Sequence, residues 1–373
     1  MNKIKTAVIG YGKVAHLHAA ALQALSQSAF CSVYGRNKER AQNFAKQYGI
    51  HAYSDLSEMI DKERIEAVCN CTPHPVHAMS SIPLLERGVH VLVEKPLASS
   101  LSDCDAMIAA AKAFGSRLGM ISQRRFYEPV IRVKDAIDSG KIGIPAIGMA
   151  TLFGWRDTSY YQSDPWRGKW MEEGGGVLVN QAPHQLDLLQ WYMGPVEELF
   201  GYRENMNHPY IEVEDTALAV LKFKNGALGN IIVSNSQNPA LYGKVHVFGR
   251  NGASVGVQTD GGAMFIAGVS DIEEPPVNDL WTIRGEEQLL KQWQEEDRTR
   301  FMQINAMQHY HSLQIEDFLK AVIEGRPPLV TGEDGRKTVE IFTAIYRSQR
   351  DKEPVKFPVQ AEQNKKDFDG RLA

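Results

Sequence analysis

The first third of the chain alternates short apolar runs with longer stretches in which apolar residues recur at helical spacing. Short apolar runs bounded by turn residues are typical of buried strands, and the periodic stretches between them are typical of helices. The expected strands are residues 5–9, 31–34, 67–71, 89–93 and 117–121, and the expected helices are 14–25, 38–48, 54–60, 77–87 and 101–114. Strict alternation of strand and helix predicts a doubly wound parallel sheet with helices on both faces.

The pattern changes after about residue 123. Several strand-like runs follow one another, and Asn-Gly pairs at 225–226 and 251–252, typical of tight turns, separate them. This arrangement predicts a second, α+β domain with a large, mainly antiparallel, open-faced sheet. Its expected strands are 146–153, 216–222, 227–234 and 244–248, its expected helices are 127–139, 177–193, 309–324 and 339–350, and 270–301 is an excursion from the sheet. The predicted divisions are a first domain over 1–123, a second over 124–358 and a polar tail over 359–373.

Charge and composition narrow the class of protein. The 373 residues include 41 Lys and Arg against 45 Asp and Glu, so the net charge is −4. This near-balance argues against binding nucleic acid or an anionic membrane through bulk charge. No apolar run approaches the ~20 residues of a membrane-spanning helix, and the first residues do not resemble a signal peptide. Because four cysteines in a chain of this size do not make a disulfide framework, we expect a cytoplasmic protein.

A glycine-rich turn joins the first expected strand to the first expected helix. Gly10 permits a tight turn, and Gly12 lets the backbone approach a pyrophosphate closely. Ala15 stands where a small residue allows the helix to pack on the strand. Lys13 and Val14 open the helix, whose free N–H groups and partial positive charge favour phosphate. The turn therefore predicts dinucleotide binding, with a plain strand–helix connection as the alternative.

The end of the second expected strand bears on the choice of cofactor. An acidic residue at this place would bind the ribose hydroxyls of NAD, but the chain has Arg36 in the segment Tyr-Gly-Arg-Asn at 34–37. A guanidinium can pair with a 2′-phosphate, which a carboxylate would repel. Arg36 therefore favours NADP slightly over NAD. It could instead stack on the adenine or be an ordinary surface arginine.

Three further motifs accompany this turn. Cys-Thr-Pro-His-Pro-Val-His at 71–77 follows the third expected strand, and Glu-Lys-Pro at 94–96 follows the fourth. A glycine run at 174–176 opens a segment that ends in Pro-His-Gln-Leu-Asp at 183–187. Together the motifs closely resemble the Gfo/Idh/MocA family of glucose–fructose oxidoreductase, inositol dehydrogenase and rhizopine-catabolism proteins. The resemblance extends from residue 4 to about residue 358.

The resemblance implies an NAD(P)-dependent oxidoreductase that acts on a sugar, inositol or related polyol. It implies a Rossmann sheet whose strand ends hold the nicotinamide, because ligands of such sheets bind at the carboxyl ends of the strands. Besides the glycine turn and Arg36, the cofactor residues it implies are Thr72, Pro73, His77, Glu94, Lys95 and Gln123. The second domain would present a broad sheet face, so we expect a homodimer or homotetramer.

Oxidation of a secondary alcohol needs a group that accepts the hydroxyl proton as the C–H bond breaks. The resemblance brings Lys95 and His184 together at the substrate carbon. A histidine has a reference pKa of about 6.5 and suits this role without any shift. We therefore assign His184 as the base and Lys95 as an orienting donor or proton relay. The reverse assignment stays open.

Two residues near His184 bear on this chemistry. Asn180 stands four residues earlier, so on one continuous helix both would face the same way. Many relatives carry aspartate there, and asparagine can bind a substrate hydroxyl but cannot lend negative charge to an imidazole. Asp187 could orient the ring instead, or be a structural helix contact. These residues do not have the ligands and spacing of a metal site, so no metal is expected.

A loop from residue 154 to 170 is dense in aromatic and cationic side chains. Aromatic faces pack against sugar C–H surfaces, and guanidinium groups bind hydroxyls or carboxylates. The substrate-wall candidates are Trp155, Arg156, Trp166 and Arg167, and Arg124 at the domain junction joins them. A structural flap or an oligomer contact is an equally good interpretation of this loop.

Two other functions stay open. Some relatives cleave glycosidic bonds through transient oxidation by bound NAD, and a few have lost chemistry and act as nucleotide-sensing regulators. The presence of both Lys95 and His184 disfavours the regulator. Nothing in the sequence excludes glycoside cleavage, and the departure at Asn180 slightly favours it.

Overall fold

The computed structural model describes residues 3–259 and 275–363. The chain divides into two compact units, which are described here one at a time. The first unit contains Met1–Gln123 and Asn305–Arg336, and the second contains Arg124–Ile304 and Lys337–Ala373. Residues 305–336, which the sequence analysis assigned to the second domain, thus lie in the first unit. Most of the expected polar tail, residues 364–373, lies outside the described residues.

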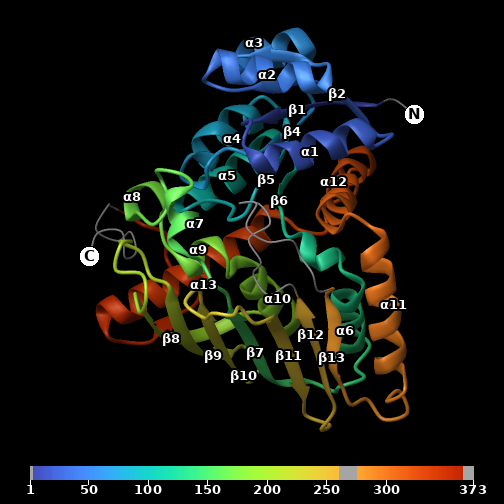
Figure 1. The fold of residues 1–373 in the computed structure, drawn as a ribbon, viewed down its shortest axis with the longest axis vertical. Coiled ribbons are helices and arrows are strands. Elements are labelled where there is room, and N and C mark those ends of the chain that lie inside the picture. The colour runs from blue at the N-terminus through green and yellow to red at the C-terminus, as the bar shows by residue number, and fades with distance from the viewer. Residues whose placement is uncertain (1–2, 260–274, 364–373) are drawn as a thin grey trace. The chain divides into compact units, whose positions relative to one another are not determined.

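The first unit is built on a six-stranded parallel sheet (Figure 1). Its strands are β1 (Ile4–Ile9), β2 (Ser28–Tyr34), β3 (His51–Tyr53), β4 (Ala67–Asn70), β5 (His90–Val93) and β6 (Leu118–Met120). They lie in the order β3-β2-β1-β4-β5-β6, so the direction of winding reverses between β1 and β4. This order confirms the doubly wound sheet, and such a reversal is where a nucleotide crevice forms.

Helices cover this sheet. They are α1 (Lys13–Ala24), α2 (Lys38–Tyr48), α3 (Leu56–Glu63), α4 (His77–Leu85), α5 (Leu101–Phe114) and α12 (Ala306–Glu324), with short 3₁₀ turns η1 (His74–Val76) and, at the unit boundary, η2 (Gln123–Phe126). Although α12 is far away in sequence, its Ile315 and Phe318 belong to the same buried core as Val8 of β1 and Leu22 of α1. The first 123 residues therefore complete their core only with a helix from near the C-terminus.

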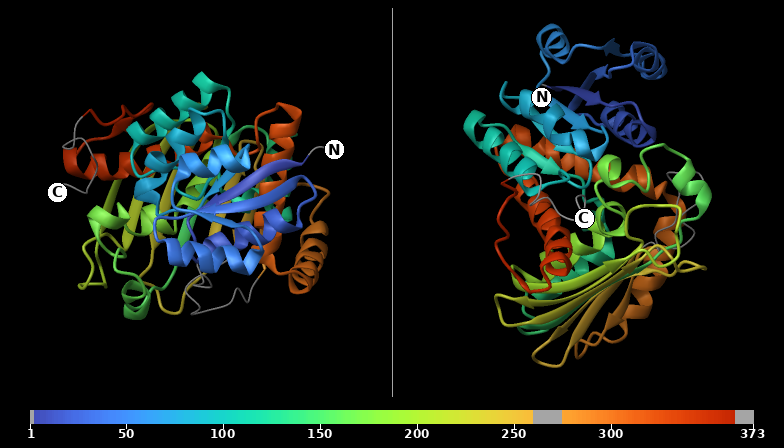
Figure 2. Two further views of the ribbon diagram at one scale, coloured as in Figure 1. Left: turned by 90° about the horizontal axis from the view of Figure 1, so that it is seen from above. Right: turned by 90° about the vertical axis from the view of Figure 1, so that its left-hand side faces the viewer.

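The second unit is built on an eight-stranded mixed sheet (Figure 2). Its strands are β7 (Pro145–Phe153), β8 (Val196–Glu204), β9 (Thr216–Phe223), β10 (Leu228–Ser234), β11 (Gly243–Gly249), β12 (Ser254–Thr259), β13 (Val277–Trp281) and β14 (Val355–Lys356), in the order β13-β12-β11-β7-β10-β9-β8-β14. Only β7 and β10 pair in parallel among these strands, so the prediction of a mainly antiparallel sheet is confirmed.

The second unit departs from the prediction at several places, including the helices α7 (Thr158–Gln162) and α8 (Trp170–Glu173) and the strands β8 and β12, which were not expected. Its other helices are α6 (Glu128–Asp138), α9 (Val177–Asn180), α10 (Pro183–Met193), α11 (Leu289–Gln303) and α13 (Gly332–Asp351), which begins in the first unit. The expected helix at 177–193 is wrong as one element, because Pro183 begins a new helix and disfavours helical continuation before it. The expected excursion at 270–301 is also wrong where it is described, since it contains β13 and α11.

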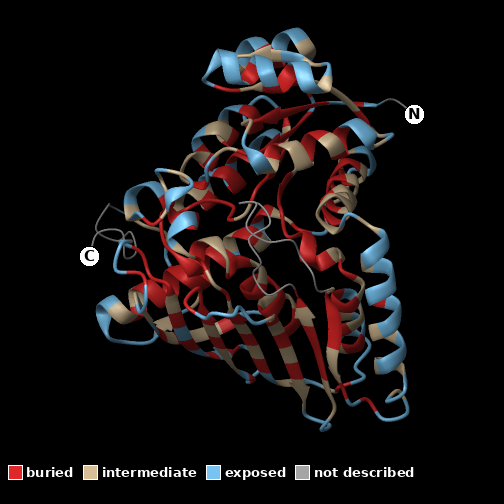
Figure 3. Ribbon diagram, viewed as in Figure 1, coloured by how far each residue is buried: buried red, intermediate tan, exposed pale blue. Residues whose placement is uncertain are grey.

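One face of the second sheet carries exposed apolar side chains. Along β9, Ala217, Ala219 and Leu221 are buried, whereas Leu218 and Val220 are 43% and 62% exposed. This alternation is visible as bands on the strands (Figure 3) and is typical of a sheet with one face in the core. The exposed apolar face also includes the side chains of Ile147, Tyr202 and Leu228 on the neighbouring strands.

Candidate active site

The glycine turn of the first unit has the geometry of a phosphate cradle. Gly10 has φ +93°, and a Cβ there would lie 2.6 Å from the carbonyl oxygen of Cys71, so this position requires glycine. A Cβ at Gly12 would meet nothing within 4 Å, so the space beside this residue is open. Helix α1 starts from Gly12 without a side-chain cap and without an acidic residue in its first turn, whereas Asn37, Asp55, Ser100 and Asn305 cap their helices. The N–H groups of Lys13 and its neighbours therefore fit a pyrophosphate.

An aromatic ring from the glycine turn, not singled out from the sequence, packs against the end of β2. Tyr11, between the two glycines, lies across Gly35 so closely that a Cβ there would be 2.0 Å from its ring. Its hydroxyl accepts from the Asn37 N–H at 3.2 Å, and the Arg40 guanidinium lies 4.9 Å from the ring centroid. Arg36, which follows Gly35 in the chain, is exposed. The strand end thus presents a phenol ring and two guanidinium groups.

Buried side chains shape the loop that follows β4. The Asn70 amide donates to Ser81 Oγ at 2.8 Å, and its Oδ1 accepts from the backbone N–H and hydroxyl of Thr72 at 3.1 and 2.7 Å. The ring nitrogens of His77 lie 2.8 Å from the carbonyl oxygen of Thr72 and 2.9 Å from that of Pro96. His77 therefore connects this loop to the Glu-Lys-Pro segment. Burial lowers the pKa of its imidazole.

Glu94 of the Glu-Lys-Pro segment is buried beneath the turn rather than displayed at the surface. Its Oε1 lies 2.7 Å from Nε2 of His18 on α1, and its Oε2 accepts from the Lys95 N–H at 3.2 Å. Burial alone would raise the pKa of Glu94, but the hydrogen bond and charge of His18 lower it to about 2. Burial also lowers the pKa of nearby His311, on α12, to about 4. Neither histidine was identified from the sequence, because each is defined by a partner on another element.

In the second unit, the glycine run wraps around a buried carboxylate. A Cβ at Gly176 would lie 1.8 Å from the backbone oxygen of Glu214. The Oε1 of Glu214 accepts from the N–H groups of Gly176 and Leu178 at 3.0 and 3.1 Å, and from the Tyr346 hydroxyl at 2.9 Å. Burial raises the pKa of Glu214. Glu214, which no pattern in the sequence identifies, thereby anchors the start of α9.

Asn180 ends α9, and His184 is the second residue of α10. Because the helix is interrupted between them, helical spacing does not by itself put them on one face, as the sequence analysis expected. The Asn180 amide nitrogen donates to Glu173 Oε1 at 2.5 Å and to the Tyr160 hydroxyl at 3.2 Å. Both Asn180 and His184 are partly exposed. Glu173 is a further residue that the sequence analysis missed.

The structure gives Asp187 a structural partner. The Arg125 guanidinium donates to both oxygens of Asp187, at 2.8 and 2.6 Å, and both side chains are buried. The same guanidinium lies 4.9 Å from the ring of Trp191. A bidentate buried pair of this kind fixes both partners strongly. The contact supports the structural interpretation of Asp187.

The aromatic and cationic loop folds around one phenol. The Arg167 guanidinium donates to the Tyr160 hydroxyl at 2.5 Å, and the Arg156 guanidinium lies 5.3 Å from the Tyr160 ring. Arg156 is 5% exposed, whereas Trp155 and Trp166 are partly exposed. The two arginines thus have a structural role in the loop, and the two tryptophans retain surface.

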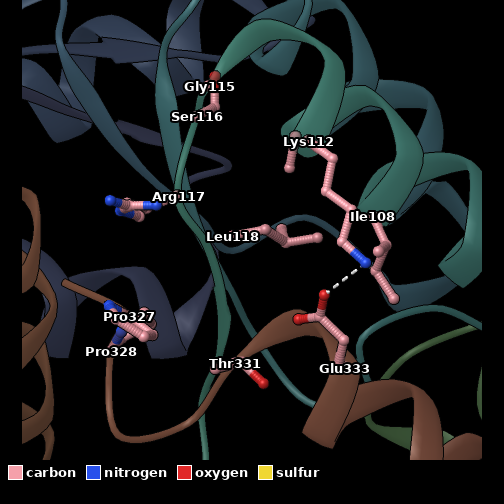
Figure 4. A pocket seen from close by; sticks show the side chains of 11 residues that line it. Ile108, Lys112, Gly115, Ser116, Arg117, Leu118, Pro327, Pro328, Thr331 and Glu333 are labelled. Atoms are coloured by element: carbon pink, nitrogen blue, oxygen red, sulfur yellow. Dashed lines mark ion pairs between the residues drawn. The ribbon is translucent and has the colours of Figure 1, made fainter. Parts of the chain in front are cut away.

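Two other predicted residues are buried. Arg124 is 5% exposed and donates to Thr259 Oγ1 at 3.4 Å, and Gln123 is 6% exposed. A cavity of about 350 Å³ in the first unit contains none of the predicted residues (Figure 4). It lies beside the segment that leads into the amino end of β6, where the ammonium of Lys112 pairs with Glu333 at 3.1 Å. The candidate residues follow the carboxyl ends of β1, β4 and β5, so this cavity is not the candidate site.

An open phosphate cradle on a doubly wound sheet, followed by a broad mixed sheet, defines a dinucleotide-dependent dehydrogenase of two units. The chain belongs to the Gfo/Idh/MocA family. The family model described as "Oxidoreductase family, NAD-binding Rossmann fold" matches residues 4–122, and the one described as "Oxidoreductase family, C-terminal alpha/beta domain" matches residues 134–357. The protein is therefore an oxidoreductase of the NAD-dependent dehydrogenase class.

Relatives match along nearly the whole chain. Myo-inositol 2-dehydrogenase of Thermotoga maritima is 27% identical, over 95% of this chain and 98% of its own length. The scyllo-inositol 2-dehydrogenase (NAD(+)) of Bacillus subtilis is 25% identical, over 96% of this chain and 97% of its own length. The structure of the WlbA dehydrogenase from Bordetella pertussis, in complex with NADH and UDP-GlcNAcA, is similar with a TM-score of 0.81 and 28% identity, covering 96% of this chain and 100% of that one. Within the described residues, none of the helices has the length and apolar character to span a membrane.

Proposed function

We propose that the protein transfers a hydride between a nicotinamide cofactor and a secondary hydroxyl carbon of a sugar, inositol or related polyol. The observation that carries the proposal is the open, uncapped start of α1 at Gly12 in the same unit as Lys95, which follows β5. The relatives named as inositol dehydrogenases support the substrate class. So does the neighbour in complex with a nucleotide sugar acid.

A bound nicotinamide supplies the hydride acceptor or donor. The chain's own residues must then handle the hydroxyl proton, because the C–O bond becomes a carbonyl only when that proton leaves. We assign His184 as its acceptor and Lys95 as a cation that orients the hydroxyl oxygen or relays the proton. Both are partly exposed, as groups that meet a substrate must be. The alternative assignment exchanges the two roles.

The substrate contacts proposed in the second unit follow from the hydrogen bonds already described. The amide nitrogen of Asn180 donates to Glu173 and Tyr160, so its carbonyl oxygen is the group that suits a substrate hydroxyl. Trp155 and Trp166 offer partly exposed rings to the C–H faces of a sugar. The proposed wall also includes Arg124, Arg156 and Arg167. Arg124 and Arg156 are buried, and Arg167 is partly exposed.

For the cofactor, we propose that NADP binds at least as tightly as NAD. The exposed Arg36 and Arg40 at the end of β2 support this preference, because they can pair with a 2′-phosphate. The residues proposed to hold the cofactor are Gly10, Gly12, Lys13, Val14, Arg36, Thr72, Pro73, His77, Glu94, Lys95 and Gln123. Of these, Glu94 and His77 act from buried positions that shape the loops.

We also propose that the protein is a homodimer or homotetramer. The exposed apolar face of the second sheet, with Val220 at its centre between Phe200 and Asn230, supports association. The Oδ1 atom of Asn230 on this face is buried and has no hydrogen-bond partner among the described residues.

A substrate panel tests the function. The purified protein is mixed with NAD⁺ or NADP⁺ and with myo-inositol, scyllo-inositol, aldoses, sugar acids or glycosides, and nicotinamide absorbance at 340 nm is followed. We expect reduction with at least one sugar or polyol. Product analysis on the glycosides separates oxidation from cleavage, which would release a sugar without net reduction of the cofactor. Tight nucleotide binding with no reaction on any compound would favour the regulator instead.

A further inference from the structure

We propose that Glu173 is a positioning residue whose carboxylate fixes the orientation in which the Asn180 amide meets the substrate. This inference rests on the proposed function, since it takes Asn180 to contact a substrate hydroxyl. Glu173 is the last residue of α8, directly before the glycine run, and is 2% exposed. Neither the family motifs nor the expected chemistry assigns a role to it.

Both oxygens of Glu173 accept hydrogen bonds. The Oε1 atom accepts from Asn180 Nδ2 at 2.5 Å, and Oε2 accepts from the backbone N–H of Gly168 at 2.5 Å. An ionised carboxylate can accept at both oxygens, whereas a protonated one must donate from one of them. The observed pattern is therefore that of the ionised form. Protonation would turn one oxygen into a hydroxyl, which accepts less well, and would weaken both contacts by removing the charge.

The partners of Asn180 permit only one orientation of its amide. Its Nδ2 also donates to the Tyr160 hydroxyl at 3.2 Å, and that oxygen accepts from Arg167 Nη1 at 2.5 Å and from Gln181 Nε2 at 3.1 Å. A flipped amide would put its Oδ1 against the Glu173 carboxylate and the crowded phenol oxygen. Because the ionised carboxylate only accepts, it needs the amide N–H group, and the flip is unfavourable. Asn180 therefore keeps its carbonyl oxygen for other partners as long as Glu173 is ionised.

The surroundings of Glu173 bring its titration close to neutral pH. Burial raises the pKa of this carboxyl to about 7, and the charge of Glu214 also raises it. The hydrogen bonds from Gly168 and Asn180 and the Arg167 guanidinium act in the opposite direction. Tyr160 and Tyr161 also face the carboxyl, and both have a raised pKa and stay neutral. Arg156 lies beyond the Tyr160 ring. A small change in pH thus changes the charge that holds Asn180.

The direct test observes the Asn180 amide itself. With ¹⁵N-labelled asparagine, its side-chain resonance is assigned by comparison with Asn180→Ala and followed from pH 5.5 to pH 8.5. We expect it to titrate with a midpoint near pH 7 in the wild type and to lose that titration in Glu173→Gln. Glu172→Gln is the matched control, because Glu172 is the exposed neighbour on the same helix. A titration that persists in Glu173→Gln, or that is missing from the wild type, overturns the proposal.

Kinetics on a compound from the substrate panel give the functional test. Glu173→Gln should lower kcat/KM roughly 10- to 100-fold and remove one of the two protonations on the acid side of the pH profile. The other belongs to His184. Glu173→Asp should retain both protonations, and Glu172→Gln should behave as the wild type. A lower kcat/KM with an unchanged pH profile would mean a purely structural role, which contradicts the proposal.

Failure of the proposed function gives a different result. If Asn180→Ala and His184→Ala leave kcat/KM unchanged, the substrate assignment itself is wrong. If those two variants lose activity while Glu173→Gln keeps both its activity and its acid-side profile, only the role of Glu173 is wrong. NADH binding by fluorescence and a thermal melt accompany each variant, since Glu173 lies outside the unit that contains the glycine turn.

Discussion

Nε2 of His18 lies 2.7 Å from Oε1 of Glu94, and both side chains are buried. The contact joins α1, which presents its N–H groups at the glycine turn, to the segment that carries Lys95. A buried carboxylate is tolerated only when donors or cations surround it. Glu94 has two such donors, the imidazole of His18 and the Lys95 N–H. The cofactor turn and the proposed donor to the substrate are thereby held by one carboxylate.

This pair should make the free energy of unfolding depend on pH in the acid range. The folded pKa of Glu94 is about 2, below its ordinary value of 4.5, so its contribution is present above about pH 4.5 and disappears as the pH falls towards 2. We expect Glu94→Gln to lower the free energy of unfolding at pH 7 by about 2–3 kcal/mol. Urea denaturation at pH 7 and pH 4 measures this. The exposed Glu86→Gln is the control, and equal stability of the two variants at pH 7 would contradict the role of the pair.

The two glycines of the turn should respond differently to substitution. At Gly12 a Cβ meets nothing, so Gly12→Val should lower the free energy of unfolding by no more than about 1 kcal/mol, the cost of a poorer N-cap residue. It should weaken NADH binding at least tenfold, because the side chain fills the space that a pyrophosphate would use. Gly10→Ala should destabilise the fold, since its Cβ would overlap with Cys71. Fluorescence titration with NADH and urea denaturation separate the two effects; undiminished binding by Gly12→Val would argue against the cradle.

The proton-handling residues should affect turnover more than cofactor affinity. Lys95→Ala and His184→Ala should each lower kcat by roughly 10²- to 10⁴-fold, with the dissociation constant of NADH changed less than tenfold. Steady-state rates on a compound from the panel and NADH titration measure the two quantities. Lys46→Ala, on the exposed face of α2, is the control. Normal turnover by either variant would remove that residue from the proposed chemistry.

The cofactor preference should depend on Arg36. Arg36→Asp should weaken NADP binding at least tenfold and leave NAD binding equal or tighter, because a carboxylate repels a 2′-phosphate and accepts from ribose hydroxyls. Calorimetry with both cofactors measures this. The exposed Arg64→Asp, on another surface segment, controls for the change of net charge. A wild type that strongly prefers NAD would contradict the proposed preference.

Association should depend on the exposed face of the second sheet. Val220 is 62% exposed there, and Val220→Glu should split a dimer or tetramer into smaller species. Ile323 on α12 is 48% exposed and belongs to the first unit, so Ile323→Glu is a matched control that should not change the mass. Light scattering at micromolar concentration reports the outcome. A monomeric wild type would show that this face does not associate.

The strand–helix alternation predicted every strand of the first sheet except β3, a three-residue edge strand whose side chains are exposed or only partly buried. The same reasoning missed β13, whose second residue, Asn278, is fully buried. Its amide donates to the backbone of Pro129 and Gly256 and its oxygen accepts from Arg132. These partners are far away in sequence, so no local pattern marks the residue as buried.

In the candidate site, too, the features set by neighbouring residues could be predicted, and those set by partners far away in the sequence could not. The glycine turn could be predicted because a tight turn and an uncapped helix are properties of neighbouring residues. His18, Glu173 and Glu214 could not, since each is defined by a partner on another element. The roles of Lys95 and His184 and the cytoplasmic location stay predictions.

Helix α12 has a practical consequence for anyone who divides this chain. A fragment that ends at residue 123 would leave an apolar surface uncovered, because Ile315, Phe318 and Leu319 close the core around β1 and α1. Such a fragment should aggregate or bind nucleotide poorly, although it contains every glycine of the turn. Tethering residues 305–336 to it through a flexible linker should restore a folded nucleotide-binding piece.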